Sequence, residues 1–156
     1  MQGDAAIIEL LNDVLKAELT AISQYFCDSR MLDDWGYDRL AEKFRDESID
    51  EMKDADALIE RILYLDGMPN LQTLDKLHIG ENAAEKIGAA LELERQAIDR
   101  LNRGIAKAVE VGDNGTRDLL ASILSGEEDH ADWLESQLTL IEQVGEANYL
   151  AQQIRE

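Results

Sequence analysis

The chain has 156 residues, of which 45% are apolar and 31% are charged, and its 34 acidic and 15 basic residues give a net charge of −19. This composition excludes a disordered acidic tail and fits one packed domain, which we expect to cover residues 1–156. The excess of carboxylates repels the phosphates of nucleic acids and the headgroups of anionic lipids, so neither is an expected partner, whereas cations are attracted.

The sequence also argues against a membrane span and against secretion. The longest run without a charged side chain is nine residues, Leu19 to Cys27, far below the roughly 20 apolar residues that cross a bilayer. Residues 1–4 contain no basic stretch and no cleavage signal, and the single Cys27 cannot form an internal disulfide. We therefore expect a cytoplasmic protein.

Apolar residues recur at steps of three and four in four long segments, which predicts four helices. In the first, over residues 4–33, the apolar face comprises Ile8, Leu11, Leu15, Ile22 and Phe26. The same spacing predicts helices over residues 38–65, 82–111 and 116–144, with a short fifth helix over residues 146–153. No stretch alternates in the manner of a strand, so the predicted fold class is all-α.

The lengths of the connections predict how these helices are arranged. The links at residues 34–37 and 112–115 are so short that the helices on either side must be antiparallel neighbours. The link at residues 66–80 has fifteen residues, and at about 3.4 Å per residue it reaches roughly 50 Å, enough to travel the length of a helix. Helices two and three can therefore run parallel, which predicts a ferritin-like four-helix bundle with a long crossover.

Acidic residues interrupt the apolar face of every long helix. The residues concerned are Glu18, Glu51, Asp54, Glu94 and Glu127, together with His130. A single carboxylate in an apolar interior costs several kcal/mol or takes up a proton, so five converging carboxylates require a shared positive charge. A site for two metal ions supplies that charge.

The spacing of these residues is duplicated. Intervals of 33 and 36 residues separate Glu18 from Glu51 and Asp54, and the same two intervals follow Glu94. The repeat lets two antiparallel hairpins bring their ligands to one level, and it matches the known pattern of di-iron carboxylate bundles except at Asp54. One acid alone is equally consistent with a solvated helix flank, whereas the duplicated set favours a metal site or an evolutionary remnant of one.

Several stretches of the sequence are similar to a known family. They are ELTAISQYF at 18–26, DDWGY at 33–37, ESIDEMK at 47–53, IERILYLDGMPNLQTL at 59–74 and EEDHADWLESQLTLI at 127–141. Through them the chain resembles the bacterioferritins along essentially its whole length. The resemblance implies a hollow shell of 24 subunits that oxidises Fe(II) at a di-iron centre in each bundle and stores ferric mineral inside.

The resemblance also assigns ligands. It places the iron ligands at Glu18, Glu51, Glu94, Glu127 and His130. At position 54, where the family has His, this chain has Asp. Asp54 can reach the same metal, but with it the site holds five carboxylates, formally −5 against +4 for two Fe(II). Asp54 is therefore either a sixth ligand or the mark of an impaired centre.

Met52 is assigned to haem by the same resemblance. The family binds haem b between two subunits through the methionine that directly follows the glutamate of its first Glu-x-x-His pair. In this chain that glutamate is Glu51 and the methionine is Met52. One step beyond Glu51 turns the side chain by about 100°, away from the bundle interior. Packing against a neighbouring subunit is the alternative reading of an outward Met. Two thioether ligands favour ferrous haem, which suits an electron relay from a ferredoxin-like reductant to the stored iron.

Four further residues carry weaker signals. Tyr25 follows Glu18 by seven residues, so it can hydrogen-bond a ligand or simply fill the core. Asp46 and Asp50 can pass iron between the shell's cavity and the centre, or belong to a solvated acidic face. Cys27 is expected to be a small buried residue and not a reactive thiol.

Two functions remain open at this point. The first is an iron-storing ferroxidase that uses dioxygen or peroxide, with or without impairment by Asp54. The second is a haem-carrying structural subunit whose centre is impaired and which assembles with a second, active bacterioferritin subunit type. A di-iron oxidase of small molecules is less favoured because no redox domain is appended, and a DNA-protecting relative because no basic tail is present.

Overall fold

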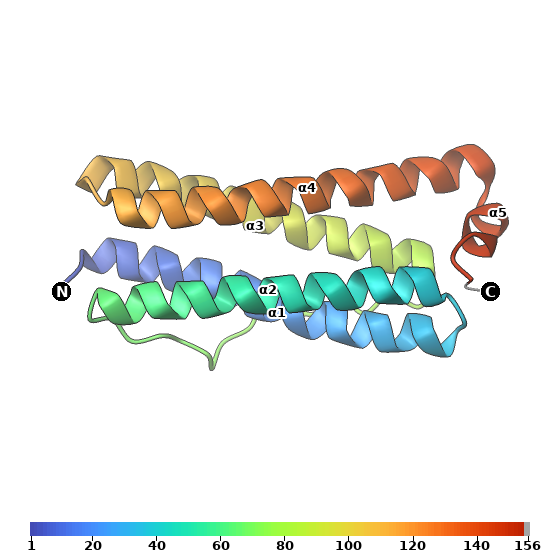
Figure 1. The fold of residues 1–156 in the computed structure, drawn as a ribbon, viewed down its shortest axis with the longest axis horizontal. Coiled ribbons are helices and arrows are strands. Elements are labelled where there is room, and N and C mark those ends of the chain that lie inside the picture. Colours follow the sequence, from blue (N-terminus) through green and yellow to red (C-terminus); the bar gives the residue numbers. More distant parts are fainter. Residues whose placement is uncertain (155–156) are drawn as a thin grey trace.

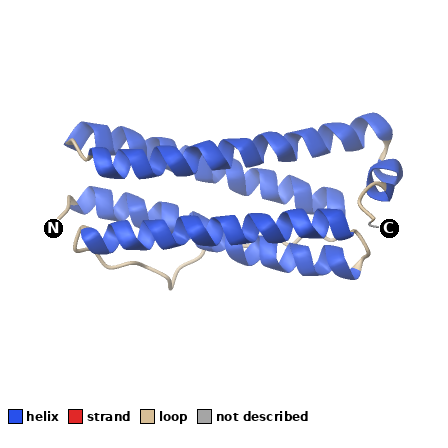
Figure 2. Ribbon diagram, in the orientation of Figure 1, coloured by secondary structure: helices blue, strands red, loops and turns tan. Residues whose placement is uncertain are grey.

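The computed structural model describes residues 1–154, and these form four long helices and one short helix. The helices are α1 (Ala5–Asp34), α2 (Asp38–Tyr64), α3 (Ala83–Val111), α4 (Asn114–Val144) and α5 (Glu146–Ala151). No strand occurs within residues 1–154 (Figure 2), which confirms the all-α prediction. Across these same residues, no helix is both long and apolar enough to cross a membrane. The expected domain ends at residue 156, and residues 155 and 156 lie outside the described part.

The helix ends follow local capping chemistry, which explains where the predicted boundaries shift. Asp4 accepts hydrogen bonds from the amides of Ala6 and Ile7 at the start of α1. Helix α4 begins two residues earlier than expected because Asp113 caps it through the amide of Thr116. Helix α5 is two residues shorter than expected and gives way to a turn after Ala151. Each difference is a matter of one or two residues at an end.

The expected order of two hairpins joined by a long crossover is present. In Figure 1, α1 and α2 run antiparallel, the segment 65–82 returns along the bundle, and α3 then runs in the direction of α2. Three backbone amides of this crossover donate to side chains of α1: Asn70 to Asn12 (2.8 Å), Asp75 to Thr20 (2.9 Å) and His78 to Gln24 (2.9 Å). The crossover is thereby fixed along the outside of α1, where it satisfies its own backbone donors.

The apolar core is divided into two clusters by a polar level at mid-bundle. One cluster contains Phe44, Leu91 and Leu134, and the other contains Leu11 and Ile62. In each long helix the glutamate that the sequence analysis predicts as a metal ligand falls between the residues of the two clusters. The two apolar layers therefore enclose the acidic residues on both sides.

The prediction that Phe26 belongs to the apolar face of the first helix is wrong. Phe26 is 63% exposed, whereas its neighbour Tyr25 is fully buried in the core. One residue along a helix turns the side chain by about 100°, so a stripe that includes Tyr25 must place Phe26 outside. Cys27, expected to be buried, is half-buried.

Candidate metal centre

Six side chains from all four long helices meet at the middle of the bundle. Ligand atoms of Glu51, Glu94, Glu127 and His130 lie within 4.8 Å of one another, and so do ligand atoms of Glu18, Glu51, Asp54 and Glu127. The two sets share Glu51 and Glu127. The arrangement thus consists of two overlapping groups of candidate ligands with two carboxylates common to both.

These side chains are removed from water. Glu18, Glu51, Glu94, Glu127 and His130 are all buried, and Asp54 is half-buried. Both carboxylate oxygens of Glu18 and one each of Glu94 and Glu127 have no hydrogen-bond donor among the described residues. Buried carboxylate oxygens without donors are costly, so they fit a bound cation. A set of carboxylates with one imidazole suits iron.

Burial dominates the electrostatics of the cluster. It raises the pKa values of Glu18, Glu94 and Glu127 well above their ordinary range, and repulsion from neighbouring carboxylates adds to the rise for Glu18. Burial also raises the pKa of Asp54 to about 7, assisted by Glu127 and Asp50, whereas it lowers the pKa of His130. Without metal the cluster therefore holds protons at neutral pH, and a cation must displace them.

Tyr25 combines both of the roles considered for it. Its hydroxyl donates a hydrogen bond to Oε1 of Glu94 at 2.5 Å, and its ring packs edge-on against Phe44 in the core. Nδ1 of His130 lies 2.9 Å from the same oxygen of Glu94. Glu94 is therefore held between a residue of α1 and a residue of α4, which fixes its orientation.

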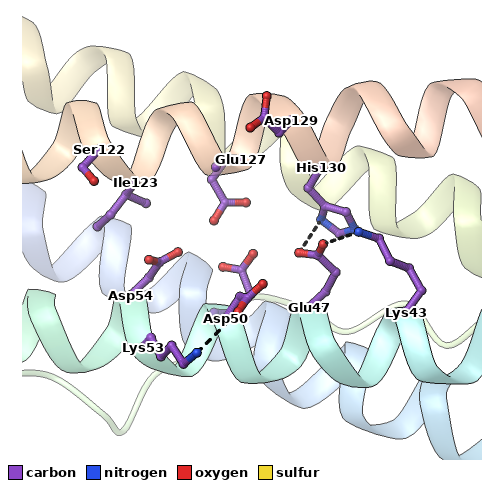
Figure 3. A pocket seen from close by; sticks show the side chains of 12 residues that line it. Lys43, Glu47, Asp50, Lys53, Asp54, Ser122, Ile123, Glu127, Asp129 and His130 are labelled. Atoms are coloured by element: carbon purple, nitrogen blue, oxygen red, sulfur yellow. Dashed lines mark ion pairs between the residues drawn. The ribbon is translucent and has the colours of Figure 1, made fainter.

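The centre opens to the surface between α2 and α4. A pocket of about 390 Å³ is lined from one side by Asp50, Lys53 and Asp54 and from the other by Asp129 and His130, among others (Figure 3). This opening gives a cation a direct path to the carboxylates. The two apolar clusters flank the buried carboxylates toward the two ends of the bundle.

The structure separates the two acids assigned to iron transfer. Asp50 lines the opening and pairs with Lys53 at 3.9 Å. Asp46 instead lines a separate groove between α1 and α2 together with Arg30 and Arg45. Asp46 precedes the pocket residue Glu47 by one position, and the turn of about 100° carries it out of the pocket. The structure thus does not bring Asp46 together with the other predicted metal-site residues.

Two residues at the centre were missed by the sequence analysis. Oε2 of Glu47 lies 3.5 Å from Nδ1 of His130. Oε1 of Glu47 pairs with the ammonium of Lys43 at 2.9 Å. Glu47 is one helical turn before Glu51, so the same periodicity that singled out Glu51 could have found it. Lys43 carried no such signal because a lysine in an acidic helix reads as an ordinary surface residue.

Met52 lies apart from the centre, as expected from its position after Glu51. It is 55% exposed and does not line the pocket between α2 and α4. Ile49, one turn earlier, is 40% exposed. The outer surface of α2 therefore presents apolar side chains on the side away from the carboxylates.

Comparison with known proteins agrees with this geometry. A family model described as a ferritin-like domain matches residues 8–144. The bacterioferritin of Mycobacterium leprae (strain TN) is 46% identical over 152 residues, which cover 97% of this chain and 96% of that protein. The bacterioferritin of Streptomyces coelicolor is 47% identical over 151 residues, 97% and 90% of the two chains, and that of Rhodobacter capsulatus is 45% identical over 145 residues, 93% and 90%.

Such identity over nearly the full length of both proteins establishes kinship. The matched region includes α2, α3, α4 and most of α1, and therefore every helix that supplies a buried carboxylate. The chain therefore belongs to the bacterioferritin family.

Proposed function

We propose that this protein stores iron as a subunit of a shell and oxidises Fe(II) at a di-iron centre within its bundle. The observation that carries the proposal is the pair of overlapping ligand sets that share Glu51 and Glu127. Two buried carboxylates common to both sets suit bridging ligands. Membership of the bacterioferritin family supports iron storage as the purpose of the chemistry.

Each side chain has a defined part in this proposal. Glu51 and Glu127, which belong to both ligand sets, would hold both ions. Glu18 and Asp54 would complete the first set, and Glu94 and His130 would complete the second. Carboxylate oxygens are hard donors that stabilise Fe(III), so oxidation is favourable here. Two Fe(II) held there would each lose one electron and become Fe(III). These two electrons, with two protons from solvent, would reduce dioxygen to hydrogen peroxide or hydrogen peroxide to water.

The protein's own contribution is to hold protons and ligands in place. In the absence of metal, protonation of the buried carboxyls relieves their mutual repulsion, and these protons leave as cations bind. Tyr25 and His130 orient Glu94 before any metal arrives. The pocket between α2 and α4 admits the ion, while the apolar layers exclude water from the other sides.

Asp54 favours the ferroxidase reading over an inert subunit. A carboxylate oxygen of Asp54 lies within 4.8 Å of ligand atoms of Glu18, Glu51 and Glu127, and this proximity supports the proposal that Asp54 is a ligand. Five carboxylates carry −5 against +4 for two Fe(II), and this surplus favours the ferric state. We therefore propose that iron is oxidised readily but released slowly, in one burst followed by sluggish turnover.

Haem binding and assembly belong to the same proposal. The apolar residues Phe26, Ile49 and Met52 are 63%, 40% and 55% exposed, which suits a contact with a second copy of the chain. Met52 and its symmetry mate would each give one axial thioether to a haem b in a 24-subunit shell, whether of one subunit type or two. The haem would accept electrons from a ferredoxin-like reductant during iron release. We place the assembly in the cytoplasm.

Metal titration and rapid kinetics test the ferroxidase proposal. The apo-assembly should bind two Co(II) per subunit under anaerobic conditions, and two Fe(II) per subunit mixed with dioxygen should give a fast ferric absorbance phase. Glu127→Gln should abolish both, because it removes a bridging ligand, whereas Asp46→Asn, an acid outside the cluster, should leave both unchanged. Slow mineral growth alone in the parent protein would favour the structural-subunit alternative.

A further inference from the structure

Lys43 lies at the opening of the metal centre and is held from two sides. Its ammonium nitrogen pairs with Oε1 of Glu47 at 2.9 Å (Figure 3). The same nitrogen lies 4.9 Å from the ring centroid of Trp133. The side chain is 35% exposed, and that of Glu47 only 13%. An ion pair with so little water around it is screened less than a surface pair and is correspondingly harder to open.

Both partners of Lys43 also contact His130. The second carboxylate oxygen of Glu47 is 3.5 Å from Nδ1 of His130, and the Trp133 ring stacks against the imidazole with centroids 6.2 Å apart. Lys43 thus determines the position of two groups that flank one proposed iron ligand. It contacts none of the six proposed ligands through an ion pair or hydrogen bond described in residues 1–154.

We propose that Lys43 is a positioning residue that gates the admission of cations to the His130 end of the centre. The inference rests on the proposed function, since it concerns how that centre is loaded. Glu47 and His130 line the same pocket, and the pairing of Lys43 with Oε1 of Glu47 competes with an incoming divalent ion for this carboxylate.

The second lysine of the opening provides a contrast. Lys53 pairs with Asp50 at 3.9 Å, and the two side chains are 76% and 63% exposed. Water screens this pair and competes for both partners, so it presents little barrier to a cation. Replacing either lysine removes one positive charge from the same pocket, but only the change at Lys43 frees Glu47.

The test follows Co(II) binding through Trp133. The chain has two tryptophans, so Trp35→Phe leaves Trp133 as the only one, stacked on His130. In this background, anaerobic stopped-flow quenching of the apo-assembly by Co(II) should become about three- to tenfold faster with Lys43→Met. Lys43→Arg should restore the parent rate because it keeps the ion pair. Lys53→Met, matched in charge and position, should stay close to the parent.

A second variant examines the route through Glu47. With Glu47→Gln the ion pair is already lost, so adding Lys43→Met should change the rate little, and the two substitutions should not be additive. The gate would be overturned if Lys43→Met bound Co(II) at the parent rate, or if Lys53→Met accelerated binding as much as Lys43→Met does. Either result would leave the proposed di-metal centre intact. Absence of saturable Co(II) quenching in every variant would overturn the proposed function, and the gate with it.

Discussion

Tyr25 and Glu94 are joined across the bundle by a hydrogen bond of 2.5 Å between the tyrosine hydroxyl and Oε1 of the glutamate. The two residues come from α1 and α3, in different hairpins. Burial and the neighbouring Glu94 raise the pKa of Tyr25 well above its ordinary value, so the phenol remains a donor at neutral pH. The contact links the packing of the two hairpins to the orientation of a proposed iron ligand.

Removal of this donor is expected to affect both stability and metal binding. Tyr25→Phe should lower the free energy of unfolding of the apo-protein by about 1–2 kcal/mol and weaken Co(II) binding at the position formed by Glu94 and His130. Chemical denaturation and Co(II) titration measure the two effects. Tyr149→Phe is the matched control, because Tyr149 donates to Gln137 at 2.8 Å away from the centre and should change stability alone. Equal metal binding in both variants would contradict a positioning role for Tyr25.

The apo-protein should lose stability as the pH rises. The pKa values of the buried Glu94 and Glu127 are raised in the folded state, so between the ordinary carboxyl pKa and the folded pKa the native state holds more protons than the unfolded state. The free energy of unfolding therefore falls with pH in that range, by about 1–3 kcal/mol between pH 5 and pH 8. Denaturation in urea at several pH values measures this slope.

Bound metal should reduce the dependence of the free energy of unfolding on pH. Cations replace the protons of the cluster, so the loaded protein gains stability at neutral pH, and loading releases protons that calorimetry in two buffers detects. Glu127→Gln, which cannot ionise, should reduce the slope of the apo-protein. A rise in the stability of the apo-protein from pH 5 to pH 8 would contradict the protonated cluster.

Asp54 should control turnover more than the first oxidation. Asp54→His removes one negative charge from the site and should raise the rate of multiple-turnover Fe(II) oxidation severalfold, while changing the first burst little. Stopped-flow absorbance at two Fe(II) per subunit and at a large excess separates the two phases. If Asp54→Ala matches the parent in metal stoichiometry and in both phases, Asp54 is not a ligand and the structural-subunit reading becomes the better one.

Met52 should be required for haem and not for assembly. Met52→Leu keeps the apolar surface but removes the thioether, so haem absorbance should disappear while light scattering still reports the shell. Met68→Leu is the control, since Met68 is 81% exposed on the crossover and should retain haem. Haem that persists in Met52→Leu would assign its ligation elsewhere, and a monomer in solution would exclude the shell.

A fully buried ion pair should dominate the stability of the α1–α3 contact. Lys86 lies 2.9 Å from Asp28, and neither side chain is exposed. Burial raises the pKa of Asp28 to about 6 despite the opposing charge of Lys86. Lys86→Met leaves a buried unpaired carboxylate and should cost about 3–5 kcal/mol, whereas the additional change Asp28→Leu should recover most of that loss. Thermal or urea unfolding measures both, and additive losses would contradict a coupled pair.

The sequence by itself determined the helices, their order and the six-residue cluster. Periodicity revealed each amphipathic helix, and residues 66–80 are long enough for a crossover that lets the second and third helices run parallel. The repeated intervals of 33 and 36 residues placed the cluster because helical pitch converts sequence separation into position along and around a helix. These properties are local or depend only on chain length, so no knowledge of tertiary contacts was needed.

Only the tertiary structure decided which side chains meet between helices. The apolar pattern of the first helix tolerated either Tyr25 or Phe26 inside, and packing against Phe44 selected Tyr25. Lys86 and Asp28 read as ordinary charged residues, yet both are buried. Likewise, nothing along α2 indicated that Lys43 would hold Glu47 beside a histidine of α4. Such pairings depend on the rotation of each helix about its own axis and on its distance from its neighbours, which are set by the packing of the whole core.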